Sequence, residues 1–178
     1  KLRTDITTQR DAEQLAAFDS YKNTKKSEAD GLKESGDSEK VLLLISNAKS
    51  AINALTYDES KSLDNNKAKV DAIISELKNN IKAQRIADKA SADEAAFIEY
   101  KITRKADASA LAKGGDSDKV LLLISNAKND IDDLNYNGNK SLEENKALVD
   151  AIITKLGTDI ATQRAADKLA ADKAAFDE

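Results

Sequence analysis

Apolar residues between positions 39 and 55 recur at alternating steps of four and three. The set consists of Val41, Ile45, Ala48, Ile52 and Leu55. This spacing places the set on one face of a helix, so the pattern predicts a short helix with a single buried seam. The preceding triplet Gly36-Asp37-Ser38 offers a side-chain oxygen for the first free backbone N–H groups and an acid at the positive end of the helix.

A second pattern predicts a much longer helix, from about residue 62 to residue 112. It opens with an apolar stripe and continues through Ala-rich sequence to Phe97, Ile98, Tyr100 and Ile102. The stripe contains Val70, Ile74, Leu77 and Ile81. The chain has no Pro, so nothing in this stretch removes a helical hydrogen bond. We expect Gly114-Gly115 to end the helix, because Gly adopts the left-handed conformation at low cost.

Both patterns recur after 79 residues. Val41-Leu-Leu-Leu-Ile-Ser-Asn-Ala-Lys49 returns unchanged at positions 120 to 128, and Val70-Asp-Ala-Ile-Ile74 returns at 149 to 153. This is a tandem duplication. The frame that we choose from the sequence has residues 1–38 as the end of a preceding unit, 39–117 as a full unit and 118–178 as a second, truncated unit. A start at Lys1 and ends inside units lead us to expect a processed product or an excerpt.

The predicted fold is all-α: an elongated, antiparallel, coiled-coil-like helical bundle with one short and one very long helix per repeat. The apolar residues are mostly Ala, Leu, Ile and Val, and only 4% of the chain is aromatic. Narrow seams of this kind need a neighbouring helix for stability. We expect the few aromatic residues to be buried packing anchors. They are Phe18, Tyr21, Phe97, Tyr100 and Phe176 within the helices, with Tyr57 and Tyr136 at the helix corners.

Composition argues against catalysis and against several kinds of partner. The chain lacks Cys and His, the residues most used for nucleophilic, acid-base and zinc chemistry, and its carboxylates alternate with Lys on predicted solvent faces. We therefore expect no enzyme activity. The net charge of −4 with interspersed signs predicts no nucleic-acid partner. The longest apolar run, Val41 to Ile45, is too short for membrane insertion.

One segment fits a calcium-binding pattern. Residues 133 to 144 match the EF-hand loop motif at every specified position. Side-chain or backbone oxygens of six residues would surround Ca²⁺, the only cofactor that the sequence suggests. The candidate ligands are Asp133, Asn135, Asn137, Asn139, Ser141 and Glu144. Only two of them carry charge, and the first repeat has no matching loop, so the site would be weak and unpaired.

The same residues fit a second interpretation, which we favour. A tight turn at Asn137-Gly138 would be followed by a capping box, in which Ser141 and Glu144 satisfy the first donors of the next helix. Asn139-Lys140-Ser141 also matches the glycosylation triplet, which we attribute to chance in an Asn-rich loop.

A resemblance to one protein family rests on the Ala-rich segment from Gln84 to Tyr100, with a Leu/Ile seam before it and Val120-Leu-Leu-Leu-Ile after it. Acidic, helical, Ala-rich sequence poor in Cys and Pro resembles the ciliate trichocyst matrix proteins, which form the lattice of secretory granules. The resemblance implies a structural protein that packs laterally into an ordered, calcium-responsive matrix. It also implies self-association and related helical matrix chains as partners, in the granule lumen, with release outside the cell.

The 28 basic residues against 32 acidic ones depart from a simple acidic calcium store. The alternative is a helical repeat segment of a bacterial surface protein, acting as a stalk or ligand-binding module at the cell surface. Tandem, nearly identical units rich in Lys, Ala and Asp are equally typical of that class.

Overall fold

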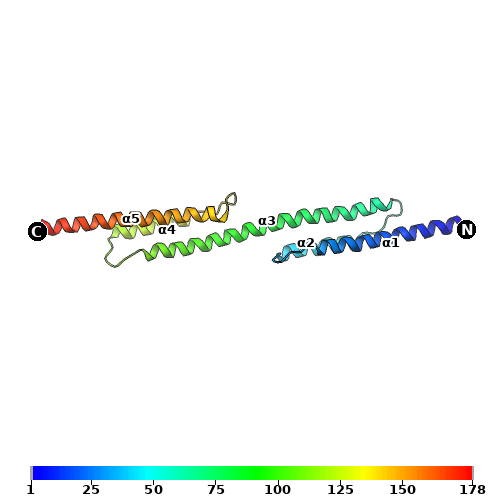
Figure 1. The fold of residues 1–178 in the computed structure, drawn as a ribbon, viewed down its shortest axis with the longest axis horizontal. Coiled ribbons are helices and arrows are strands. Elements are labelled where there is room, and N and C mark those ends of the chain that lie inside the picture. Colours follow the sequence, from blue (N-terminus) through cyan, green and yellow to red (C-terminus); the bar gives the residue numbers. More distant parts are fainter. Residues whose placement is uncertain (1, 178) are drawn as a thin grey trace. The chain divides into compact units, whose positions relative to one another are not determined.

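The computed structural model describes residues 2–177, with side chains described from residue 8 onward. These residues form five helices in the order α1 (Leu2–Asp30), α2 (Glu39–Ala54), α3 (Leu63–Ala110), α4 (Asp118–Asp133) and α5 (Leu142–Phe176), shown in Figure 1. The described part of the chain contains no strand. The all-α bundle predicted from the sequence is confirmed.

The chain divides into two compact units, unit 1 (Lys1–Lys89) and unit 2 (Ala90–Glu178). Each unit has three helices: α1, α2 and the first part of α3 in unit 1, and the rest of α3, α4 and α5 in unit 2. Within a unit the short middle helix runs antiparallel to the two helices beside it (Figure 1). The predicted long helix is confirmed as α3, which has 48 residues and contributes to both units.

The sequence frame and the structural units begin at different places. Residues 1–38, which we assigned to the end of a preceding unit, supply α1 of unit 1. Phe18 and Ala29 of α1 lie in the same buried core as Val41 of α2 and Val70 of α3. A helix that completes a core belongs to that unit, whereas the sequence period alone leaves the starting point of the repeat free.

The predicted seams are buried. On α2, Val41, Ile45, Ala48 and Ile52 are at most 9% exposed, and Leu55 follows as the half-buried C-cap. The stripe of α3 is also buried, and unit 2 repeats the α2 seam with Val120, Ile124, Ala127 and Ile131. Burial of these faces is the main stabilising term, because the thin stripes are too weak to hold isolated helices in water.

Serine caps begin the short helices, as predicted. Ser38 and Ser117 have extended backbones, and their side chains accept hydrogen bonds from the N–H groups of Val41 and Val120. The prediction for the end of α3 is wrong, because the helix ends at Ala110, before Gly114-Gly115. Gly115 instead has a φ of 91° within the turn that leads to Ser117, and Gly36 has a φ of 90° at the equivalent place. The glycine sets the entry to the next helix.

The aromatic predictions are confirmed for two residues and wrong for one. Phe18 and Phe97 are each 1% exposed, and the corner tyrosines Tyr57 and Tyr136 lie against them with ring centroids 5.7 and 5.9 Å apart. The predicted anchors Tyr21 and Tyr100 are half-buried. Phe176, in contrast, is 89% exposed. Phe18 and Phe97 are each covered by a corner tyrosine, and no aromatic ring is described against Phe176 within residues 8–177.

Candidate functional site

The predicted calcium loop joins α4 to α5. Asp133 is the last residue of α4, and Ser141 is the N-cap of α5. Between them, the Lys140 N–H donates to the Asn137 carbonyl oxygen at 2.9 Å, and the Asn139 N–H donates to Asn137 Oδ1 at 3.0 Å. The chain therefore makes a tight turn over residues 137–140, held by the Asn137 side chain.

The capped-turn interpretation is confirmed. Ser141 Oγ accepts from the Glu144 N–H at 3.2 Å, and Glu144 Oε2 accepts from the Ser141 N–H at 2.8 Å. The same Glu144 oxygen accepts a hydrogen bond from the Ser141 hydroxyl at 2.8 Å. These hydrogen bonds lower the pKa of Glu144 below its ordinary value, with the backbone donor as the largest cause. Glu144 is thus ionised and already has partners within its own helix.

The candidate calcium ligands take up different roles. Asn135 donates from its side chain to the Asp133 carbonyl oxygen at 3.4 Å, and Gly138 does not have the positive φ found at Gly36 and Gly115. Among residues 8–177, no group of three or more His, Cys, Asp or Glu side chains is placed to hold a metal ion. For calcium to take Glu144 as a ligand, the carboxylate has to leave Ser141. Calcium binding by Asp133, Asn135, Asn137, Asn139, Ser141 and Glu144 stays a prediction.

Unit 1 makes the same turn with a different sequence. The Lys61 N–H donates to the Asp58 carbonyl oxygen at 3.0 Å, and the Ser60 N–H donates to Asp58 Oδ1 at 3.1 Å. Glu59 stands where unit 2 has Gly138. A buried asparagine secures each turn. Asn145 Oδ1 accepts from the Asn137 N–H at 2.9 Å, as Asn66 Oδ1 does from the Asp58 N–H at 3.0 Å.

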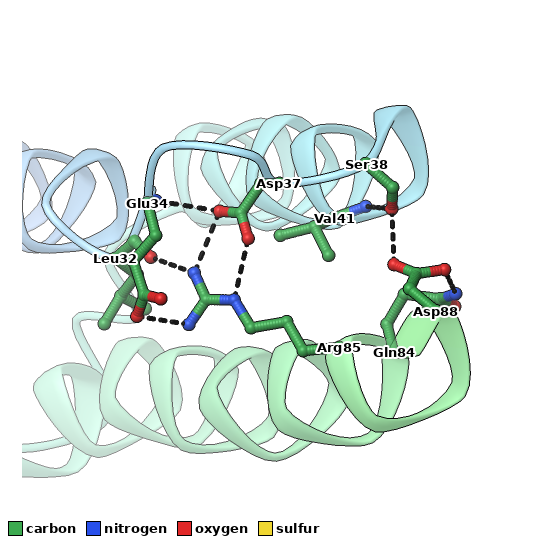
Figure 2. Close-up of polar contacts among 8 residues, drawn as sticks. All are labelled: Leu32, Glu34, Asp37, Ser38, Val41, Gln84, Arg85 and Asp88. Atoms are coloured by element: carbon green, nitrogen blue, oxygen red, sulfur yellow. Dashed lines mark hydrogen bonds and ion pairs between the residues drawn. The ribbon is translucent and has the colours of Figure 1, made fainter. Parts of the chain in front are cut away.

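A second group of polar contacts lies around Arg85 of α3 (Figure 2). Arg85 Nε and Nη2 donate to the two carboxylate oxygens of Asp37 at 2.7 and 2.8 Å, and Nη2 also donates to the Leu32 carbonyl oxygen at 2.9 Å. Nearby, the Ser38 hydroxyl donates to Asp88 Oδ2 at 2.7 Å. We call these residues, with Glu34 and Gln84, the Arg85 cluster. It ties the α1–α2 connection to α3.

Unit 2 repeats this arrangement as the Arg164 cluster. Arg164 Nε donates to Asp116 Oδ1 at 2.7 Å, its Nη2 donates to the Leu111 carbonyl oxygen at 2.8 Å, and the Ser117 hydroxyl donates to Asp167 at 2.6 Å. The side chains of Asp37 and Asp116 are only 4% and 6% exposed. Hydrogen bonds from the two arginines lower the pKa of each carboxyl to about 2.

A lysine, buried at Lys22 and half-buried at Lys101, joins the first helix of each unit to the end of the second. Lys22 Nζ donates to the Asn53 and Leu55 carbonyl oxygens at 3.1 and 2.7 Å, and Lys101 does the same for Asp132 and Leu134 at 2.9 and 2.7 Å. A cation at a helix C-terminus satisfies its free carbonyl groups and opposes its negative dipole end.

The buried polar atoms of these clusters have their hydrogen-bond partners within the chain. In the described part of the chain, no buried side-chain nitrogen or oxygen lacks a hydrogen-bond partner. Four aspartates of these clusters have lowered pKa values and occupied oxygens, which suit a helix junction; they are Asp37, Asp88, Asp116 and Asp167. The sequence predicted Ser38 and Asp37 as capping residues but did not indicate their partners on α3. The signal was present, since Gln84-Arg85 recurs as Gln163-Arg164.

None of the described helices contains an apolar stretch of the length that a bilayer span requires. Comparison of the chain with protein-family models, curated proteins and solved structures gives no match.

Proposed function

We propose that this chain is a structural protein that packs laterally into an ordered matrix, resembling the calcium-responsive core of ciliate secretory granules. The observation that carries the proposal is the recurrence of exposed aliphatic side chains on helical surfaces that are otherwise polar. Leu43 of α2 and Leu122 of α4 occupy equivalent positions and are each 59% exposed. Ile98 and Ile102, one turn apart on α3, add a further exposed pair at 52% and 60% that unit 1 does not repeat. Repetition of such residues suits repeated contacts between chains.

The interior of each unit supports a passive role. The polar clusters connect the three helices through side chains whose hydrogen bonds are made within the unit. A building block of a matrix requires rigid units with reproducible surfaces, and two units with the same clusters meet this requirement. The granule lumen, followed by release outside the cell, is the location that we propose.

A second candidate is a helical repeat segment, stalk or ligand-binding module, of a bacterial surface protein. It is favoured by α3, which contributes to both units and so allows units to be added in series through one continuous helix. The parent gene separates the two candidates. Many near-identical repeats next to a cell-wall anchor support the stalk, and a secretory precursor with cleavage sites supports the matrix protein.

Sedimentation velocity tests the matrix function directly. We expect reversible, concentration-dependent association with a dissociation constant below about 1 mM, a free energy of about −4 kcal/mol. A chain that stays monomeric throughout this range refutes lateral packing. Repeating the run with up to about 10 mM calcium, for the wild type and Glu144→Gln, tests the ion response. A response of the wild type alone supports a calcium site at Glu144, and identical responses refute it.

A further inference from the structure

The short helices of the two units differ in charge at one place. Ala51, Asn53 and Ala54 near the end of α2 are replaced by Asp130, Asp132 and Asp133 at the end of α4. All three aspartates are exposed, and the last turn of α4 has no basic residue.

Helix stability does not explain these aspartates. A helix C-terminus carries partial negative charge, so acids in the last turn are unfavourable and cations are favoured. Of these three aspartates, only Asp132 forms an ion pair within the described residues, with Lys105 at 2.5 Å. Asp130 and Asp133 form no ion pair there. Lys105 pairs with Asp132 and Lys101 binds the last carbonyl groups of α4, so Asp130 and Asp133 are the two acids left for a cationic partner outside the unit.

A groove of matching character lies between α1 and α2 of unit 1. It encloses about 620 Å³ and is lined by Lys26, Lys33 and Lys49, with apolar surface from Leu42 and Ile45. Asp30 is the one acid in its lining, so three positive charges face one negative charge, a net charge of +2. Asp30 is already paired with Lys49 at 2.7 Å, and Lys33 forms no ion pair within the described chain.

The equivalent positions of unit 2 carry less positive charge. The equivalents of Asp30 and Lys33 are Ser109 and Ala112, and Lys105 is bound to Asp132. The duplication has thus diverged in opposite directions, with a basic groove in unit 1 and an acidic helix end in unit 2. Because the two surfaces carry opposite charges, unit 1 of one copy can pair with unit 2 of a second copy.

We propose that the groove between α1 and α2 of one copy receives the exposed side of α4 from a second copy. Asp130 and Asp133 of the second copy meet Lys26 and Lys33 at the rim, and Leu122, 59% exposed on α4, contributes apolar contact area. The contact is heterologous, so each copy presents one groove and one α4, and association either closes into a ring or continues. This inference rests on the proposed function, because it names the surfaces that produce lateral packing.

Charge reversal on each side tests the pairing. The groove variant carries Lys26→Glu and Lys33→Glu, and the α4 variant carries Asp130→Lys and Asp133→Lys; Asp132 is kept because Lys105 binds it. We expect each variant alone to associate at least about tenfold more weakly than the wild type at about 0.05 M salt. An equimolar mixture of the two should recover association, because the reversed groove then meets a reversed α4.

Matched controls separate this pairing from net charge. Lys168→Glu with Lys173→Glu has the same net charge as the groove variant, and Glu59→Lys with Glu99→Lys has the same net charge as the α4 variant. Circular dichroism checks that all four proteins are folded. We expect the control mixture to gain no more than either control alone, and salt at about 0.5 M to weaken the wild-type contact.

The outcomes are distinct. If the groove variant and the α4 variant each associate as strongly as the wild type, the proposed contact is wrong and lateral packing uses another surface. Failure of the mixture to recover association, or equal recovery by the control mixture, also overturns it. A wild type that remains monomeric in low salt refutes the proposed contact and the matrix function together.

Discussion

Truncation of Phe97 to Ala should destabilise unit 2 by about 3 to 5 kcal/mol. The ring is 1% exposed and lies in a buried cluster with Ile131 and Val149. Its transfer from water accounts for about 1.5 to 3 kcal/mol. The tilted contact with Tyr136, 5.9 Å between ring centroids, adds about 0.5 to 1.5 kcal/mol. Lys101 Nζ lies 5.9 Å from the ring centroid and adds a smaller cation–π attraction.

Phe176 supplies the matched control, because it is the repeat equivalent of Phe97 but is 89% exposed. We expect Phe176→Ala to change stability by no more than about 0.5 kcal/mol. Urea unfolding followed by circular dichroism at 222 nm measures both variants, with the slope of each transition fitted freely because the chain contains two units. A loss below about 1 kcal/mol for Phe97→Ala, or equal losses for both variants, would show that the ring does not anchor unit 2.

Three further predictions concern charge, glycine and helix continuity. The carboxyl pKa of Asp37 and of Asp116 is about 2 in the folded chain, below the ordinary 3.8. The stability that these two carboxylates contribute is therefore present above about pH 4 and is lost as pH falls toward 2. The urea midpoint measured from pH 6 to 2 should show this loss, and the loss should be smaller in Asp37→Asn. Gly157→Ala should stabilise the folded chain by about 0.5 to 1 kcal/mol, because Gly157 lies inside α5 with open space around its Cα. Gly115→Ala should destabilise the folded chain, because the φ of Gly115 is 91°. The melting temperatures of the two variants should shift in opposite directions, and shifts of the same sign contradict the backbone argument. Ala90→Pro, at an exposed position inside α3, should cost about 3 kcal/mol or more and separate the unfolding of the two units into two transitions. A single unshifted transition would show that joint unfolding does not depend on an unbroken α3.

Local features of this fold are predictable because they depend on residues close together in the chain. The seam of α2 follows from the four-three spacing that begins at Val41, and the caps at Ser38 and Ser141 follow from short-range hydrogen bonds. The continuity of α3 follows from the absence of Pro and Gly between residues 63 and 110. Each of these signals lies within a few turns of the helix that it shapes.

Contacts between distant residues were not predictable in the same way. Asp37 and Arg85 are 48 positions apart, and helical periodicity says nothing about which charged residues meet across a bundle. The duplication could have suggested the pair, since both residues recur together at Asp116 and Arg164. The duplication also misled us at Phe176, because burial depends on the residues that pack on a ring and not on its position in the repeat alone.

The α4–α5 loop contains residues that its shape requires and residues that its shape does not require, and comparison of the two units distinguishes them. Unit 1 forms the same turn with Ala54, Glu59 and Asn65 at the places of Asp133, Gly138 and Glu144. The turn therefore requires neither the acid at Asp133 nor the glycine. In unit 1, Ser62 caps the start of α3 by accepting a hydrogen bond from the Asn65 N–H at 3.2 Å. In unit 2, Ser141 caps α5 in the same way, and Glu144 completes a capping box. Because the fold accounts for the shared positions, the acids that distinguish unit 2 are the residues whose charge a partner or an ion can recognise.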